Sequence, residues 1–203
     1  MKMNVTLIGD SGVGKTAIIN RFVNGIFNNL QAPNVAGVNI NKQIQINEQT
    51  INMKIWDTAG QEAYRSIAPI YYQHANVIII VFAVGNDDQK AKNSRESFKS
   101  VNRWYNQVQE FKEGVTIVLC GNKIDLQNRE ISFNEGAKKA KTLPDVIEYY
   151  ETSALSGDGI FEMFQEICEK FIESNTHDNS HDSERQDLPL GKFEPSDNNL
   201  RCC

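Results

Sequence analysis

The stretch Gly9-Asp10-Ser11-Gly12-Val13-Gly14-Lys15-Thr16 follows an apolar run and precedes apolar residues at helical spacing. It matches the pattern G-x-x-x-x-G-K-[ST], whose glycines let the backbone curl so that successive N–H groups point at phosphate oxygens. A plain glycine turn is the alternative, but the strand before the motif and the helix after it favour a phosphate site at the positive end of the helix dipole. Lys15 is expected to neutralise the β- and γ-phosphates, and the Thr16 hydroxyl to ligate Mg²⁺. The predicted phosphate contacts are Ser11, Gly12, Val13, Gly14, Lys15, Thr16 and Ala17.

Apolar runs alternate with stretches of helical periodicity along the rest of the chain, which is typical of β-α-β units and a largely parallel sheet. Residues 40–46 and 51–55 alternate as the arms of a hairpin with its turn near Asn47-Glu48, which predicts an antiparallel edge. Core stripes at helical spacing run from Phe98 to Phe111 and from Phe161 to Phe171. The sequence therefore predicts an α/β fold, a mostly parallel six-stranded sheet with helices on both faces and one antiparallel edge strand. The other strands are expected at residues 3–8, 77–84, 115–121 and 146–151.

Asp57 follows the strand that ends in Lys54-Ile55-Trp56. An aspartate at the end of a strand is usually a turn or a helix cap, but right-handed crossovers would place this one at the same end of the sheet as the phosphate loop. Its carboxylate is therefore expected to hold Mg²⁺ through water, because that ion gives up its hydration shell reluctantly. Gly60 is expected to approach the γ-phosphate with its N–H. Gln61 is expected to orient a water for in-line attack, with Lys15 as the second catalytic group.

Asn122-Lys123-Ile124-Asp125 and Thr152-Ser153-Ala154 each follow a predicted strand. Ionised Asp125 only accepts hydrogen bonds, so it suits the N1–H and 2-amino groups of guanine and would face an acceptor in adenine. An isolated N-K-x-D is usually a surface turn, but three motifs in the required order favour a base site for GTP or GDP. An ATP-dependent metabolic kinase is disfavoured by Asp125 and by the lack of a separate acceptor-substrate domain. The predicted guanine contacts are Asn122, Lys123, Asp125, Ser153, Ala154 and Leu155.

The composition excludes several other classes of protein. A net charge of −5 gives no basic face for nucleic acid. The longest apolar run, Val77 to Val84, is far shorter than the roughly 18 residues of a membrane span and predicts a strand buried on both faces. Residues 1–5 lack the apolar region of a signal peptide, so the chain is expected in the cytosol with reduced cysteines, Cys120 and Cys168 lying in the core. The histidines, which lack metal-ligand spacing, are His74, His177 and His181.

Together these motifs resemble the Ras superfamily of small GTPases over residues 3–172, and most closely its Rab branch. The resemblance implies a single P-loop GTPase (G) domain over residues 1–172 that acts as a monomer. It implies that Phe27 packs against guanine and that residues 28–41 and 58–75 are switch segments contacted by effectors, an exchange factor and a GTPase-activating protein. The likeness rests on Gly9–Thr16, Trp56 before Asp57, Arg65-Ser66-Ile67-Ala68-Pro69-Ile70-Tyr71-Tyr72, Glu151-Thr152-Ser153-Ala154 and Cys202-Cys203.

The first switch segment departs from the family pattern, because no threonine occurs between Thr16 and Thr50. Asn34 or Val35 stands where the family has the threonine that closes over Mg²⁺, and Asn34 would offer a carboxamide oxygen as a weaker metal ligand. No arginine lies in residues 26–45 to act as an internal finger, a group worth roughly 10³ to 10⁵ in rate, so unassisted hydrolysis is expected to be slow. The alternative function is a guanine-nucleotide-binding module with little hydrolysis or weak switching.

Residues 173–203 are rich in polar and acidic residues and are expected to form a disordered tail. Cys202 and Cys203 resemble the double geranylgeranylation signal of Rab proteins, and unmodified thiols are the alternative. An acidic tail supplies no polybasic membrane signal, so two lipid chains would be needed for stable anchoring. The resemblance implies contact with the prenylation and membrane-extraction machinery. It also implies a place on the cytoplasmic face of a vesicle or endosomal membrane, in exchange with the cytosol.

Overall fold

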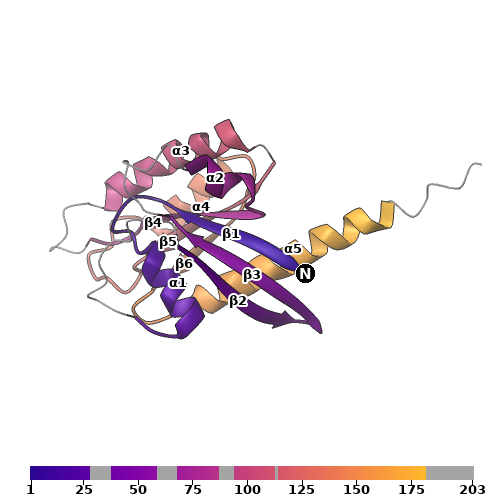
Figure 1. Cartoon of the computed structure of the whole chain (residues 1–203). Coiled ribbons are helices and arrows are strands. Elements are labelled where there is room, and N and C mark those ends of the chain that lie inside the picture. The colour runs from indigo at the N-terminus through magenta and orange to yellow at the C-terminus, as the bar shows by residue number, and fades with distance from the viewer. Residues whose placement is uncertain (28–37, 59–67, 87–93, 113, 182–203) are drawn as a thin grey trace, which may run out of the picture. The chain divides into compact units, whose positions relative to one another are not determined.

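The computed structural model describes residues 1–27, 38–58, 68–86, 94–112 and 114–181. Apart from one hairpin, its strands and helices alternate along the chain (Figure 1). The strands are β1 (Lys2–Ile8), β2 (Val38–Ile46), β3 (Gln49–Asp57), β4 (Val77–Ala83), β5 (Thr116–Asn122) and β6 (Val146–Thr152). The helices are α1 (Lys15–Asn24), α2 (Ala68–Gln73), α3 (Ser94–Phe111), α4 (Phe133–Lys141) and α5 (Ile160–His181).

The six strands form one sheet in the order β2-β3-β1-β4-β5-β6. Among these six described strands β2 and β3 pair in antiparallel fashion, and the four other strand pairs are parallel. The hairpin turn has positive φ at Asn47 (45°) and Glu48 (62°), which matches the right-handed twist of the flanking strands. The predicted α/β fold, with one antiparallel edge strand, is therefore confirmed.

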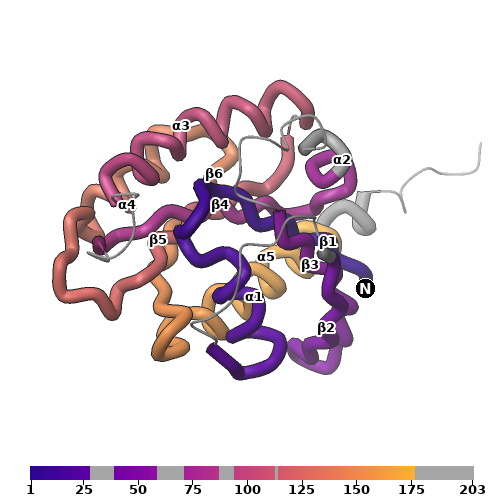
Figure 2. Tube along the Cα trace, turned by 60° about the vertical axis from the view of Figure 1, so that its left-hand side comes forward, coloured from indigo at the N-terminus to yellow at the C-terminus, as the bar shows by residue number. Residues whose placement is uncertain are grey.

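Helices cover both faces of the sheet. In Figures 1 and 2, α2, α3 and α4 lie on one face, while α1 and the first part of α5 lie on the other. On that second face Phe22 of α1 stacks on Phe164 of α5, with 3.8 Å between ring centroids. All seven residues of β4 are buried, as predicted for a strand covered on both sides. Because helices cover both faces, the loops meet at the carboxyl ends of the parallel strands, where open α/β folds bind their ligands.

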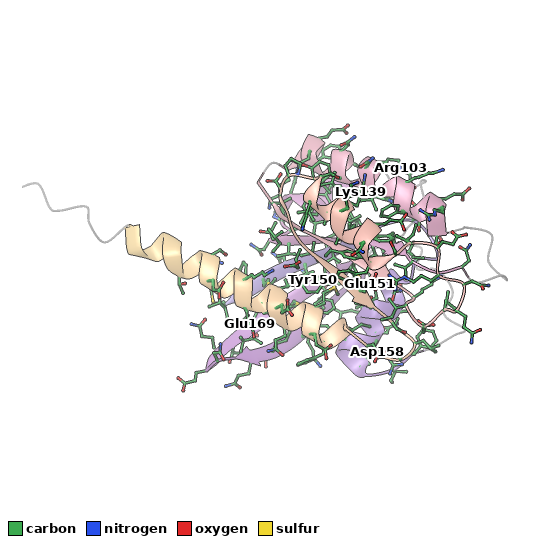
Figure 3. The ribbon with its side chains drawn as sticks, turned by 180° about the vertical axis from the view of Figure 1, so that it is seen from behind. Arg103, Lys139, Tyr150, Glu151, Asp158 and Glu169 are labelled. Carbon is green, nitrogen blue, oxygen red and sulfur yellow. The ribbon has the colours of Figure 1, made fainter. Side chains whose placement is uncertain are left out.

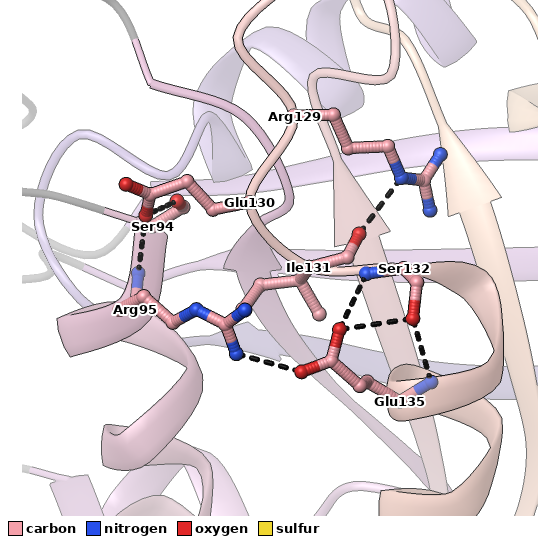
Figure 4. Close-up of polar contacts among 7 residues, drawn as sticks. All are labelled: Ser94, Arg95, Arg129, Glu130, Ile131, Ser132 and Glu135. Carbon is pink, nitrogen blue, oxygen red and sulfur yellow. Dashed lines mark hydrogen bonds and ion pairs between the residues drawn. The ribbon is translucent and has the colours of Figure 1, made fainter.

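Helix α4 was not among the predicted elements, because it buries only Gly136 and Ala140. Its start is fixed by a capping box in which the Ser132 hydroxyl accepts from the Glu135 N–H at 3.3 Å and the Glu135 carboxylate accepts from the Ser132 N–H at 2.9 Å (Figure 4). Arg95 of α3 also donates to Glu135, at 2.7 Å. The S-x-x-E spacing of Ser132 and Glu135 is a sequence signal that would have identified this helix.

Two aromatic residues predicted to be core are exposed. Phe161 is 56% exposed and Phe111 is 45% exposed. On α5 the buried stripe begins one residue earlier than predicted, so it leaves Phe161 on the solvent side. The helix also bonds to the sheet: the hydroxyl of Tyr150 on β6, labelled in Figure 3, donates to Glu166 of α5 at 2.8 Å. The buried α5 residues are Ile160, Met163, Phe164, Ile167 and Cys168.

Residues Met1–Glu169 form one compact unit and Lys170–Cys203 form a second. The tail expected from residue 173 differs from the structure, because α5 continues to His181. Polar side chains in this part bond back onto helix carbonyls: Asn175 Nδ2 donates to the carbonyl oxygen of Phe171 at 2.7 Å, and Thr176 Oγ1 to that of Glu173 at 2.8 Å. These bonds run alongside the helical backbone but do not favour it over other conformations, so the polar composition gave no signal for this part of the helix.

Candidate functional site

The loop between β1 and α1 requires glycine at two positions. Gly9 has a φ of 141°, and a Cβ atom there would lie 2.1 Å from the carbonyl oxygen of Val81 on β4. Gly14, the N-cap of α1, has a φ of 102°, and its Cβ would lie 2.3 Å from Asn122 Nδ2. The loop therefore approaches both β4 and the end of β5 more closely than any side chain allows.

Lys15 is buried at the first position of α1. Its Nζ donates to the carbonyl oxygens of Gly9 at 2.8 Å and Asp10 at 2.9 Å. A buried ammonium group needs such hydrogen-bond acceptors. The loop therefore carries a positive charge held against its own backbone, which suits an anionic ligand.

The end of β3 brings a carboxylate next to the start of α1. Parallel pairing of β1 with β3 sets Leu7 opposite Asp57. Asp57 is 1% exposed and accepts from the Thr16 hydroxyl at 2.6 Å. The next residue, Thr58, is anchored to β1 because its hydroxyl donates to the carbonyl oxygen of Leu7 at 2.7 Å. A hydroxyl and a buried carboxylate side by side are the hard oxygen donors that Mg²⁺ prefers, so the residues fit that ion.

A contact that the sequence did not reveal ties the loop to α3. Asp10 is buried, and its Oδ1 accepts from Arg103 Nη2 at 2.7 Å and from Trp104 Nε1 at 2.9 Å. Figure 3 labels Arg103 on α3. Trp104 follows Val101 by three residues on the buried stripe, and this spacing is the signal that could have found it. The two donors offset the cost of burying the carboxylate.

Asn122, the last residue of β5, connects three loops. Its Nδ2 donates to the carbonyl oxygen of Val13 at 2.8 Å. Its Oδ1 accepts from the Thr152 hydroxyl and from the Ala154 N–H, both at 3.2 Å. The loop after β1 is thereby held against the loop after β6 through one carboxamide.

The loops after β5 and β6 also meet through Asp125. Its Oδ1 accepts from the Ser153 hydroxyl at 2.5 Å, and Ser153 Oγ in turn accepts from the Ser156 N–H at 3.0 Å. Lys123 has a positive φ of 73°, which turns the chain so that Asp125 follows on an exposed loop. The carboxylate of Asp125 is fixed by a neutral hydroxyl and remains open to solvent on its exposed side.

The structure thus brings the described phosphate and base motifs to one edge of the sheet. Phe27 lies half-buried after α1, and Leu155 is 48% exposed. The predicted positions that lie outside the described residues are Asn34, Val35, Gly60, Gln61, Cys202 and Cys203.

The remaining titratable candidates do not form a second centre. Cys120 and Cys168 are buried as predicted, and burial raises the pKa of each thiol to about 12. His74 is exposed. Within the described ranges, no group of three or more histidine, cysteine or acidic side chains is arranged to hold a metal. None of the helices described has the length and apolar character needed to span a membrane.

Comparison with known proteins identifies the family. The model of the Ras family matches residues 4–173. "GTP-binding protein YPT53" of Saccharomyces cerevisiae is 34% identical over 203 residues, covering 93% of this chain and 88% of that protein. Rab-18 of Caenorhabditis elegans is 34% identical over 193 residues, with coverage of 93% and 90%, and human Rab-21 is 34% identical over 173 residues, with coverage of 84% and 72%. Because the family match spans most of the chain and the relatives are Rab proteins, this chain belongs to the Ras family and is a Rab-like small GTPase.

Proposed function

We propose that this protein is a GTP/GDP switch that binds guanine nucleotide with Mg²⁺, hydrolyses GTP slowly and acts at a membrane. The observation that carries the proposal is the convergence of the phosphate loop, Asp57 and the two base loops at the carboxyl edge of the sheet, where Asn122 of the first base loop bonds to both the phosphate loop and the second base loop. Ligands of open α/β folds bind at this edge.

The phosphate loop supplies the grip on the triphosphate. Backbone N–H groups of Ser11 to Ala17 would face the phosphates, and Lys15 would turn from the carbonyls of Gly9 and Asp10 toward the β- and γ-phosphate oxygens. Thr16 and Asp57 would hold Mg²⁺, with Asn34 as a further candidate ligand. When bound, the ion would neutralise charge on the β- and γ-oxygens.

The base loops supply the selection of guanine. Asp125 would accept from the N1–H and 2-amino groups, the stem of Lys123 would lie along the base, and the Ala154 N–H would reach O6. Phe27 would pack against the ring. Ser153 supports this arrangement because its hydroxyl already fixes one oxygen of the Asp125 carboxylate.

Exchanging the selective carboxylate tests the base assignment. Xanthine carries an oxygen where guanine carries the 2-amino group, so Asp125→Asn offers it an amide donor. We expect the variant to bind GDP at least about tenfold more weakly and xanthosine diphosphate more tightly, because a lost hydrogen bond to a charged group costs about 1.5–3 kcal/mol. Asp158→Asn, which alters an exposed carboxylate bonded to Ser156 at 2.6 Å, is the matched control and should leave both affinities unchanged. A wild-type protein that binds adenosine diphosphate as tightly as GDP would overturn the assignment.

Hydrolysis would rest on Gln61 orienting a water beside the γ-phosphate, with the Gly60 N–H and Lys15 stabilising the developing charge. No arginine in residues 26–45 is available as an internal finger. The turnover would therefore depend on an activating protein that supplies this charge. Single-turnover release of γ-phosphate should be slow for wild-type protein and slower still for Gln61→Leu. Equal rates for the two proteins would exclude Gln61 from the step.

A second candidate function is a nucleotide-binding module whose switch barely closes. The observation that favours it is the absence of threonine between Thr16 and Thr50, since Asn34 or Val35 would close over the metal less firmly. We expect a non-hydrolysable GTP analogue to give little more protection of residues 28–41 from limited proteolysis than GDP gives. Strong protection by the analogue alone would refute weak switching and favour the full switch.

The membrane role depends on Cys202 and Cys203, which resemble a double geranylgeranylation signal. Two prenyl chains would anchor the protein on a vesicle or endosomal membrane, where residues 28–41 and 58–75 would meet effectors and regulators. Replacing both cysteines by serine should leave GDP affinity intact and move the protein wholly to the soluble fraction of cells. If the double variant still sediments with membranes, the lipid anchor is wrong.

A further inference from the structure

Arg21, in the last turn of α1, belongs to none of the nucleotide motifs, yet its side chain reaches two loops of the site. Its Nε donates to the carbonyl oxygen of Ala154 at 2.9 Å, and its Nη2 donates to that of Leu155. Its Nη1 donates to the carbonyl oxygen of Gly25 at 3.0 Å. All three of these acceptors are backbone carbonyls, so the contact fixes main-chain geometry rather than pairing two charges.

The guanidinium group links the two sides of the proposed base pocket. Gly25 ends α1 with a φ of 68°, its N–H donating back to the Arg21 carbonyl at 3.0 Å, and the chain then leads directly to Phe27. Ala154 and Leu155 follow β6, more than 130 residues further along the chain. One side chain therefore holds together the segment that carries Phe27 and the segment that carries the Ala154 N–H.

The Ala154 backbone is held from both ends. Its N–H meets Asn122 Oδ1 at 3.2 Å, while its carbonyl oxygen accepts from Arg21 Nε. Ala154 is 4% exposed, so its backbone lies in the interior and not on a free loop. Arg21 thus holds the carbonyl groups of both Ala154 and Leu155. Together with the bond from the Ala154 N–H to Asn122, these contacts fix the backbone on both sides of the Ala154 Cα.

We propose that Arg21 is a positioning residue for guanine: it fixes the Ala154 backbone so that its N–H, which makes a long bond of 3.2 Å to Asn122 Oδ1, is shared with O6 when guanine binds, and it joins that N–H to the Phe27 side of the pocket. The inference rests on the proposed function of the base loops. An arginine is required because its planar fork presents N–H groups in several fixed directions, whereas lysine has a single nitrogen on a flexible stem. Lysine at this position would reach one carbonyl and leave the others without their donor.

The test compares two nucleotides that differ at O6. Full-length wild type, Arg21→Lys and Arg21→Gln are loaded with GDP or with 6-thioguanosine diphosphate, which keeps the N1–H and 2-amino groups but carries sulfur, a weaker hydrogen-bond acceptor, in place of O6, and dissociation rates are measured. We expect both variants to release GDP on the order of tenfold faster, and to release the analogue less than about twofold faster. A merely structural role would accelerate both nucleotides by the same factor.

Lys42→Met is the matched control. Lys42 on β2 donates to the carbonyl oxygen of Val23 at 3.0 Å, so its loss also removes a donor from the end of α1 but does not touch the loop after β6. Both dissociation rates should match those of wild type in this variant. If Arg21→Gln does not fold, Arg21→Lys, which keeps the charge and the stem, carries the comparison.

The possible outcomes separate the inference from the function on which it rests. Wild type that does not prefer GDP to the analogue overturns the base assignment itself. Wild type that prefers GDP, with Arg21 variants that release both nucleotides equally faster or at unchanged rates, overturns only the role of Arg21. A selective loss of GDP in both Arg21 variants supports it.

Discussion

Gly9 and Gly12 of the phosphate loop both have positive φ but very different surroundings. A Cβ atom on Gly9 would lie 2.1 Å from the carbonyl oxygen of Val81, whereas one on Gly12, with a φ of 82°, would meet no atom within 4 Å. Gly12→Ala should therefore cost only backbone strain, about 1–2 kcal/mol. Gly9→Ala should cost a further 1–3 kcal/mol or so, because the loop or β4 must move. Urea unfolding of the nucleotide-free proteins measures both, and equal losses would contradict the close approach of the loop to β4.

At this scale, motif spacing predicted which residues gather at the site but not what they touch. Lys15, Thr16, Asp57 and Asn122 could be found because each chemical role demands one residue type at one spacing. The bonds of Arg21 could not be found, since its acceptors are backbone carbonyls, which every residue possesses. The contact of Asp10 with α3 was hidden for a related reason: its partners lie more than 90 residues away.

Among the elements, α3 supports the phosphate loop through the buried carboxylate of Asp10. Arg103→Met and Trp104→Phe would each remove one donor from that carboxylate and keep most of the packing. We expect each to lower the free energy of unfolding by about 1–2 kcal/mol, because bonds to charged groups are worth about 1.5–3 kcal/mol and Arg103 is partly exposed. GDP dissociation should also accelerate, since the Asp10 carbonyl is an acceptor of Lys15.

Arg95→Met is the control for this pair, because it breaks an ion pair with Glu135 in which both side chains are largely exposed. Such pairs contribute about 0–1 kcal/mol, and this one lies away from the phosphate loop. Lower stability with an unchanged GDP dissociation rate in the Arg103 and Trp104 variants would limit Asp10 to a structural role.

The capping box of α4 gives stability a pH dependence. Bonds from the Ser132 N–H, then Arg95 and the Ser132 hydroxyl, lower the pKa of Glu135 from 4.5 to about 2. A carboxyl whose pKa is depressed in the folded state stabilises fully above its unfolded pKa and loses that contribution as pH falls through the folded value. The gap in melting temperature between wild type and Glu135→Gln should therefore be constant above about pH 4.5 and shrink from there toward pH 2. A gap that does not change with pH would show that the charge of Glu135 contributes nothing.

Periodicity predicted the elements that bury a long apolar stripe and failed where burial is slight. Helix α4 packs Gly136 against the ring of Tyr149, where a Cβ atom would lie 2.2 Å from Cζ, so its contact with the sheet depends on a missing side chain. No apolar pattern reports such a contact. The sequence also missed the last turns of α5, because the helix continues to His181 beyond its apolar stripe, through polar residues such as Asn175 that give no helical periodicity.

At the scale of the whole molecule, one continuous sheet joins the phosphate side of the site to the base side. The proposed phosphate contacts follow β1 and β3, the proposed base contacts follow β5 and β6, and the fully buried β4 separates the two pairs of strands. Asn122 and Arg21 bridge the loops above this sheet. Nucleotide binding is therefore expected to stabilise the compact unit Met1–Glu169 as a whole rather than one half of it.

Two buried thiols can test whether GDP stabilises the whole compact unit. Cys120 lies on β5 and Cys168 on α5, and burial raises the pKa of both to about 12, so neither is a reactive thiolate at pH 8. In a variant with serine at positions 202 and 203, both should label only through global unfolding and at similar rates. GDP at 100 times its dissociation constant should slow both about 100-fold, because it binds the folded state alone. Mass spectrometry of each labelled peptide measures this. Faster labelling of Cys168, or protection of Cys120 alone by GDP, would mean that α5 opens separately and that the site stabilises only the sheet.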